Sequence, residues 1–158
     1  MIVGRETRLF FDASCLFASA RSATGGSFYL LTLCRENYLQ IATTLDAIEE
    51  AERNLVAKGA PADYLTFREV IAASPFALIA RPTDAEVARY TEIVFEDDHI
   101  VAAALAGQVD ALITLDRRLF QRIAVAGIPL PAMTPGGFIK GHLPAHPEFR
   151  VPRPEHDA

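Results

Sequence analysis

The chain has 158 residues, which is enough for one domain with a sizeable hydrophobic core. Because 51% of the residues are hydrophobic and only 22% are charged, an intrinsically disordered chain is excluded. The net charge of −5 gives no general attraction for nucleic acid, although a cluster of cation-binding carboxylates would itself be negative. The apolar runs are too short to span a membrane and no basic, apolar leader opens the chain. We therefore expect a cytoplasmic protein with no membrane association.

The sequence predicts strands and helices in alternation. Short apolar runs indicate strands, and apolar residues at helical spacing between cap and turn signals indicate helices. In chain order we expect strand 8–11, helices 15–21 and 27–37, strand 39–44, helices 45–58 and 61–73, strand 76–80, helices 85–93 and from about 97, strand 110–114, helix 117–127 and strand 128–133. The strands are apolar throughout, which favours an α/β fold whose parallel sheet is covered on both faces. Prolines place the last strand at an edge of the sheet.

Cap signals set several helix boundaries. Ser14 is a candidate N-cap for the first helix, Thr43 or Thr44 for the third, and Asp84 for the helix near residue 85. Gly59 is a C-terminal signal for the helix that precedes it.

The end of the chain is rich in proline. We expect one domain over residues 1–140, followed by a proline-rich tail over residues 141–158. This tail, together with the high apolar fraction, leads us to expect a homodimer.

The cysteines and histidines give no sign of a zinc site. Cys15 and Cys34 lie in apolar segments and are expected to be reduced core residues. No two histidines stand beside a cysteine at ligand spacing.

Carboxylates follow two of the predicted strands and open one helix. Asp12 follows strand 8–11, Asp116 follows strand 110–114, and Asp97 and Asp98 begin a helix. In an open parallel sheet, ligands bind beyond the carboxyl ends of the strands, so we expect these acids to share one edge. Like charges there are tolerated when a cation lies between them, and oxygen ligands suit Mg²⁺ or Mn²⁺.

A further acid is expected from the helix over residues 45–58, whose first half contains Glu49, Glu50 and Glu52. Each acid taken singly is more often a helix cap or a solvated surface charge. Their combined placement favours a metal site.

Four segments in order resemble PIN domains. They are LFFDAS, IATTLDAIEEAERNL, DDHIVAAALAGQVDALITLDRRLF and MTPGGFI, the last of which resembles the closing segment of PIN-like toxins. The resemblance covers residues 8–139. It implies a three-layer α/β/α sandwich with a mostly parallel central sheet.

The resemblance also implies roles for individual residues. The acids expected to be catalytic and to bind metal are Asp12, Glu50, Asp97 and Asp116. Asp97 matches better than Asp98 because the family's acid stands three residues before the apolar pair. Glu50 matches through its spacing to a later leucine, although a helical wheel places Glu52 closer to the apolar stripe. Ser14 and Thr114 match small polar residues that support the acids.

By resemblance, the protein is expected to be an Mg²⁺- or Mn²⁺-dependent endoribonuclease, the toxin of a VapC-like toxin–antitoxin pair with a small antitoxin protein as its partner. Candidate RNA phosphate contacts are Arg53, Arg117, Arg118 and Lys140. Many PIN domains have a further acidic or polar residue where this chain has Arg118. This departure motivates an alternative, a catalytically weak PIN-fold module that binds RNA or protein. A phosphatase or phosphotransfer receiver is less favoured because Asp12 stands alone after its strand.

Overall fold

The computed structural model describes residues 1–149. Its sheet has five strands in the order β3-β2-β1-β4-β5, and every neighbouring pair is parallel. The strands are β1 Arg8–Phe11, β2 Gln40–Thr43, β3 Ala77–Leu78, β4 Ala111–Ile113 and β5 Ala132–Met133. All carboxyl ends therefore lie at one edge, as the apolar strand pattern predicted.

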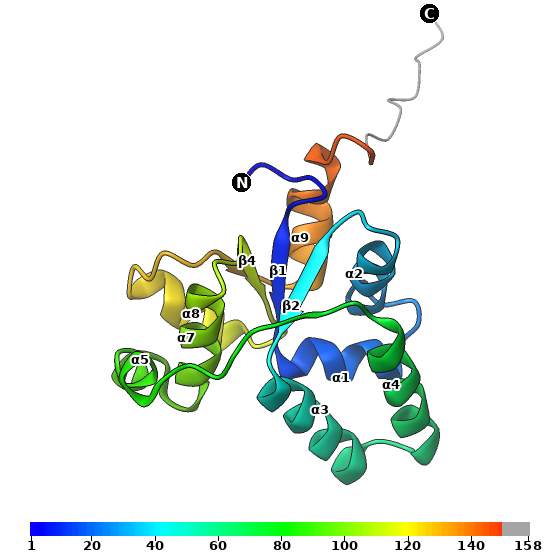
Figure 1. Cartoon of the computed structure of the whole chain (residues 1–158), viewed down its shortest axis with the longest axis horizontal. Coiled ribbons are helices and arrows are strands. Elements are labelled where there is room, and N and C mark those ends of the chain that lie inside the picture. The colour runs from blue at the N-terminus through cyan, green and yellow to red at the C-terminus, as the bar shows by residue number, and fades with distance from the viewer. Residues whose placement is uncertain (150–158) are drawn as a thin grey trace, which may run out of the picture.

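Helices connect the strands. They are α1 Ala13–Arg21, α2 Gly26–Arg35, α3 Leu45–Lys58, α4 Pro61–Ala73, α5 Asp84–Ala88, α6 Thr91–Val94, α7 Asp98–Ala106, α8 Arg117–Val125 and α9 Pro135–Gly141, with 3₁₀ turns at η1 Phe95–Asp97 and η2 Leu143–Ala145. The first four helices and α9 group on one side of the strands, and α5, α7 and α8 on the other (Figure 1). No helix in residues 1–149 is both long and apolar enough to cross a bilayer.

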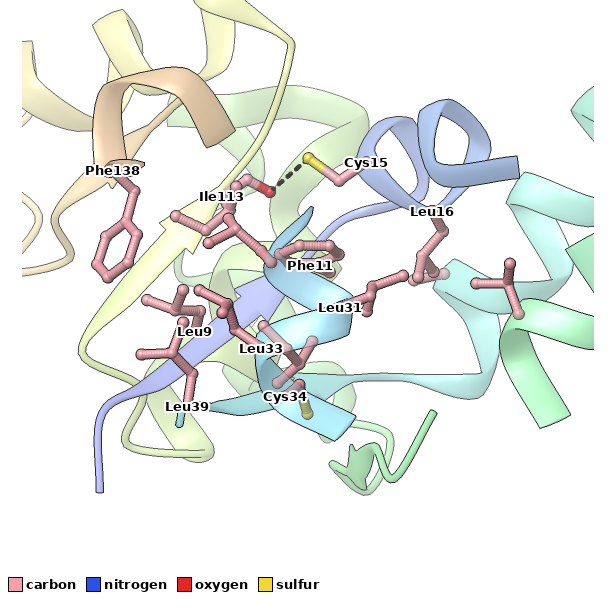
Figure 2. Packing of buried hydrophobic residues seen from close by; sticks show 14 of the residues in the cluster. Leu9, Phe11, Cys15, Leu16, Leu31, Leu33, Cys34, Leu39, Ile113 and Phe138 are labelled. Carbon is pink, nitrogen blue, oxygen red and sulfur yellow. Dashed lines mark hydrogen bonds between the residues drawn. The ribbon is translucent and has the colours of Figure 1, made fainter. Parts of the chain in front are cut away.

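The central strand β1 contributes side chains to the hydrophobic clusters on both faces of the sheet. Leu9 and Phe11 belong to the cluster under the first group of helices, whereas Phe10 belongs to the cluster under α7 and α8. Figure 2 shows Leu9 and Phe11 packed among Leu31, Ile113 and other residues of the first cluster. Since successive residues of a strand point to opposite faces, a strand that is apolar throughout has a core on each side. The three-layer α/β/α sandwich is confirmed.

Both cysteines are free and buried, as expected. The Cys15 thiol donates to the carbonyl oxygen of Ile113 at 3.3 Å (Figure 2). Burial, with the nearby Asp12 carboxylate, raises the pKa of Cys15 well above its ordinary value, so the thiol stays protonated.

Several predicted boundaries were wrong. Asp12, not Ser14, is the N-cap of α1, because its carboxylate accepts from the backbone N–H of Cys15. Thr83, not Asp84, caps α5 and forms a reciprocal capping box with Glu86. Thr44 caps α3, which was one of the two candidates.

The third strand and the last helix also differ from expectation. The buried strand expected over residues 76–80 is a two-residue edge strand, and the side chain of Leu78 is 57% exposed. An edge strand has one neighbour, so its apolar residues are less covered than those of β1. Helix α9, capped by Thr134, was not predicted, because the glycines at 136 and 137 disfavour a helix and the segment is too short to show a helical apolar repeat.

Part of the proline-rich end packs on the rest of the domain. His146 is buried; its Nε2 donates to the carbonyl oxygen of Tyr38 at 2.8 Å and its Nδ1 accepts from the N–H of Glu148. Phe149 packs edge-on against Tyr38, and Glu148 pairs with Arg5. Residues 142–149 are thus anchored to the N-terminal half, whereas residues 150–158 of the expected tail lie outside the described residues.

Candidate metal-binding site at the carboxyl edge of the sheet

Asp12 is the most enclosed of the candidate acids. It follows β1 and is 5% exposed. Its Oδ1 accepts from the Ser14 hydroxyl at 2.5 Å and from the Cys15 N–H at 3.2 Å, and its Oδ2 accepts from the Thr114 hydroxyl at 2.5 Å. Burial raises the pKa of Asp12, and the hydrogen bonds to its carboxylate oppose that rise. The carboxylate is therefore fixed in orientation by three donors.

The same hydroxyls connect Asp12 to the loop after β4. Ser14 Oγ accepts from the N–H of Leu115, and Thr114 Oγ1 accepts from the N–H of Asp116, both at 3.0 Å. Ser14 and Thr114 thus bridge two parallel neighbouring strands at their carboxyl ends. This is the supporting position the resemblance implied for them, and their role in activity stays a prediction.

Asp116 begins α8 as its N-cap. Its Oδ1 accepts from the N–H groups of Arg118 and Leu119, at 2.9 and 3.3 Å. The side chain is exposed, and its Oδ2 has no hydrogen-bond partner within residues 1–149. A helix N-terminus favours a negative charge, and the second carboxylate oxygen of Asp116 is left available to a ligand.

The adjacent acids Asp97 and Asp98 have different environments. Asp98 Oδ2 accepts from the Thr91 hydroxyl at 2.8 Å and its Oδ1 from the His99 N–H at 2.7 Å, so it is used in local structure. Asp97 is half-buried, and no side-chain hydrogen bond to it occurs within the described chain. Of the two acids, Asp97 is therefore the one whose carboxylate is free of hydrogen bonds within residues 1–149, and its role as a metal ligand stays a prediction.

The electrostatics connect Asp97 to the other two acids. Burial raises the pKa of Asp97 to about 6, and the negative charges of Asp116, Glu96 and Asp12 contribute in that order. Asp12, Asp97 and Asp116 come from three distant parts of the chain, so the fold brings them within electrostatic reach of one another. Such a shift at partly exposed, converging acids is typical of a functional site.

No hydrogen bond or ion pair within residues 1–149 connects Glu50 to this group. It is half-exposed on α3 and has no hydrogen bond or ion pair there, and it is not among the charges that raise the pKa of Asp97. Of its neighbours, Glu52 accepts from the Tyr64 hydroxyl at 3.1 Å and Glu49 is exposed. The role of Glu50 as the second acid stays a prediction.

One α3 carboxylate that the sequence reasoning did not consider is Asp46. It pairs with Arg81 at 2.6 Å, and this hydrogen bond lowers the pKa of Asp46. His99, Arg53 and Arg81 are all close enough to favour its charged form. The ion pair joins α3 to the segment after β3, a contact that no local sequence pattern predicts.

The carboxylate oxygens of the candidate acids fit a hard divalent cation that is coordinated partly by water. Within residues 1–149, no three side chains of His, Cys, Asp or Glu lie close enough together to surround a metal ion. Mg²⁺ ordinarily keeps several waters and takes one or two protein carboxylates together with substrate phosphates. The free oxygens of Asp97 and Asp116 match that chemistry, whereas zinc prefers nitrogen or sulfur ligands.

The candidate phosphate contacts are all exposed: Arg53, Arg117, Arg118 and Lys140. Arg117 and Arg118 open α8 directly after Asp116. Lys140 lies in the last turn of α9, and α9 begins at the carboxyl edge and runs away from it. The arginines of α8 are therefore better placed than Lys140 to contact a ligand of the acidic group.

The protein is a parallel α/β/α sandwich with acids beyond the carboxyl ends of its strands, the edge at which folds of this class bind their ligands. The chain belongs to the PIN domain family, because the family model described as "PIN domain" matches residues 8–118. PIN domains are generally nucleases and typically bind a divalent metal.

A solved structure supports the fold. The crystal structure of PAE2754 from Pyrobaculum aerophilum is 22% identical in sequence, with a TM-score of 0.54 over 73% of this chain and 84% of that chain. At this identity the similarity shows the fold alone. Comparison with curated proteins gives no significant match.

Proposed function

We propose that the protein is an Mg²⁺- or Mn²⁺-dependent endoribonuclease that acts in the cytoplasm as the toxin of a toxin–antitoxin pair. The observation that carries the proposal is Asp97, which is half-buried, has no hydrogen-bond partner for its side chain in residues 1–149, and lies near the charges of Asp116 and Asp12. A carboxylate with no donor and a raised pKa costs stability unless a cation occupies the site. Family membership supports nuclease chemistry at this edge.

In this proposal Asp97, Asp116 and Asp12 hold the divalent cation, and Glu50 supplies the fourth acid. A divalent cation bound there supplies an acidified water and electrostatic stabilisation for attack at phosphorus. The chain's own residues orient the site: Ser14 and Thr114 fix the Asp12 carboxylate, and the N-terminus of α8 fixes Asp116. Exposed arginines near Asp116 would contact the RNA phosphates.

The alternative is a catalytically weak PIN module that binds RNA or protein. Two observations favour it. The chain has Arg118 where many PIN domains have an acidic or polar residue, and residues 1–149 contain no compact cluster of three metal-ligating side chains. Incubating purified protein with mixed RNAs, in Mn²⁺ and in EDTA, separates the two proposals. Metal-dependent cleavage supports the nuclease, and RNA binding without cleavage supports the module.

We expect the cleavage products to carry a 5′-phosphate. Attack by water on phosphorus needs no 2′-hydroxyl nucleophile, so the leaving group is the 3′-oxygen. The measurement is enzymatic labelling of product ends, with a substrate containing 2′-deoxy residues as the control. A 2′,3′-cyclic phosphate, or complete resistance of the 2′-deoxy substrate, would contradict the metal-dependent mechanism.

We also propose a homodimer with a small antitoxin partner. The described part of the C-terminal end packs on its own chain. The support for a dimer is therefore a set of exposed apolar residues on α3 and α4, which a second copy would bury. Val56 is 70% exposed and Leu65 is 63% exposed. We expect light scattering to give the mass of a dimer for the full chain, and Val56→Glu with Leu65→Glu to give a monomer.

The matched control for the dimer is Val125→Glu, since Val125 is 89% exposed but lies on α8 in the opposite layer. It should leave the mass unchanged. A monomeric wild type at micromolar concentration would remove the proposal.

A further inference from the structure

Phe95 is an exposed aromatic residue in an unusual backbone conformation. Its φ is 52° and its ψ is −122°, which glycine adopts readily and bulky residues rarely do. The side chain is 53% exposed, so burial of the ring does not offset this strain. Strain of this kind persists where the surroundings impose it, and it concentrates at functional sites.

One face of the Phe95 ring is covered by an arginine. The guanidinium carbon of Arg122 lies 4.9 Å from the ring centroid. This cation–π contact fixes the orientation of the ring while half of its surface remains accessible. An aromatic ring held in this way is a preformed platform on which a planar group can stack.

A groove of ≈ 370 Å³ adjoins this platform. Its lining residues are Ile93, Arg118, Gln121, Arg122, Val125 and Ala126. Arg122 belongs to both features, since it lines the groove and contacts Phe95. The groove therefore combines two guanidinium groups, an amide and apolar side chains, a combination suited to a chain that alternates phosphates with planar bases.

Residues of the platform and of the groove stand close in sequence to two of the acids. Phe95 precedes Asp97 by two residues, and Arg118 follows Asp116 by two residues at the start of α8. Helix α6 contacts α8, so the two segments lie side by side in space as well. Arg118 and Phe95 therefore each stand two residues from one of the acids, where both can contact a strand whose phosphate lies at the acids.

We propose that Phe95, held by Arg122, is a base-stacking subsite for single-stranded RNA next to the acidic group, with Arg118 contacting the intervening phosphate. The inference rests on the proposed function and names the feature of the substrate that the site recognises: an unpaired base flanking the scissile phosphate. Duplex RNA, whose bases are already stacked, would not use this subsite.

The test uses fluorescence, because the natural chain contains no tryptophan. Phe95→Trp is made in an Asp97→Asn background, so that RNA is bound without being cut. The matched control is Tyr29→Trp in the same background, an exposed position on α2 in the opposite layer and outside the proposed dimer surface. The probes are oligoadenylate and oligouridylate, single-stranded and as their duplex.

We expect single-stranded RNA to quench the indole introduced by Phe95→Trp in a saturable manner. The indole introduced by Tyr29→Trp should be unchanged. Equal quenching at the two positions, no quenching at residue 95, or equal quenching by the duplex would overturn the inference. Quenching at residue 95 in a protein whose wild type does not cleave RNA would retain the subsite and remove the nuclease proposal.

A second set of variants tests the ring without a new fluorophore. Phe95→Leu and Phe95→Tyr keep the same backbone requirement, so any difference between them reports the aromatic ring. We expect Phe95→Leu to weaken single-stranded RNA binding about tenfold and to raise KM for cleavage, and Phe95→Tyr to keep both near wild type. Arg122→Lys, which keeps the charge but not the planar contact, should resemble Phe95→Leu. Wild-type affinity in both Phe95→Leu and Arg122→Lys would contradict the proposal.

Discussion

Replacing Asp97 by asparagine is expected to reduce RNA cleavage by roughly a hundredfold or more, which corresponds to about 2.7 kcal/mol of activation free energy. The same change should stabilise the metal-free protein. Burial and the charges of Asp116, Glu96 and Asp12 raise the pKa of Asp97 to about 6, so its ionised form is disfavoured in the folded state. Because the side chain is half-exposed, solvent screening limits the gain at pH 7 to about 1 kcal/mol, or roughly 3 °C in Tm.

The pH dependence of this effect has a definite sign. Between an unfolded pKa near 3.8 and the folded pKa of about 6, the native state binds more protons than the unfolded state. Metal-free wild type should therefore lose stability relative to Asp97→Asn as the pH rises through this window, and the difference should be constant above it. Thermal melts in EDTA from pH 4 to pH 8 measure it. Mn²⁺ should stabilise wild type and have little effect on Asp97→Asn, since a ligand bound only to the folded state raises stability by mass action.

Asp98→Asn is the matched control, one residue along the chain. Asp98 accepts from the Thr91 hydroxyl and the His99 N–H, so its substitution should cost stability by about 0.5–1 kcal/mol. Cleavage and the Mn²⁺ shift should be retained. If Asp97→Asn keeps the full Mn²⁺ shift, or if the two variants behave alike, the acidic group is not a metal site.

Asp12→Ala should give the largest loss of stability among the site variants, about 2–4 kcal/mol, together with loss of cleavage. The alanine leaves the hydroxyls of Ser14 and Thr114 and the N–H of Cys15 without their acceptor in a buried setting. Asp12→Asn keeps the shape and one oxygen, and the hydroxyls can rotate to accept from the new amide. It should therefore cost about 1 kcal/mol while cleavage is still lost.

The measurement is urea denaturation in EDTA alongside the cleavage assay. Ser14→Ala is the control for the hydrogen-bond network, because it removes one donor to Asp12 and leaves the acid in place. It should lower stability by about 1 kcal/mol and retain part of the activity. A wild-type unfolding midpoint for Asp12→Ala would show that the three hydrogen bonds do not fix this carboxylate.

The sequence by itself determined the elements that depend on local pattern. Continuous apolar runs in β1, β2 and β4 predicted buried parallel strands, and Thr44, Gly59 and Pro61 placed the bounds of α3 and the start of α4. These signals act over a few residues, since caps, proline and side-chain periodicity restrict the backbone where they stand. They also placed Asp12 directly after one strand and Asp116 shortly after another strand of the same parallel sheet, which was sufficient to predict a shared edge.

Only the tertiary structure decided which groups meet and which remain free. Asp12 and Thr114 are 102 residues apart, and the hydrogen bond between them exists because β1 and β4 are neighbours. Asp97 and Asp98 are neighbouring residues of the same type. Local hydrogen bonds from Thr91 and His99 fix the Asp98 carboxylate, whereas burial and the charges of Asp116 and Asp12, which are distant in the chain or in another element, raise the pKa of Asp97. The positive φ of Phe95 likewise has no local signal. Contacts, burial and backbone strain depend on residues distant in the chain, and short-range preferences do not encode them.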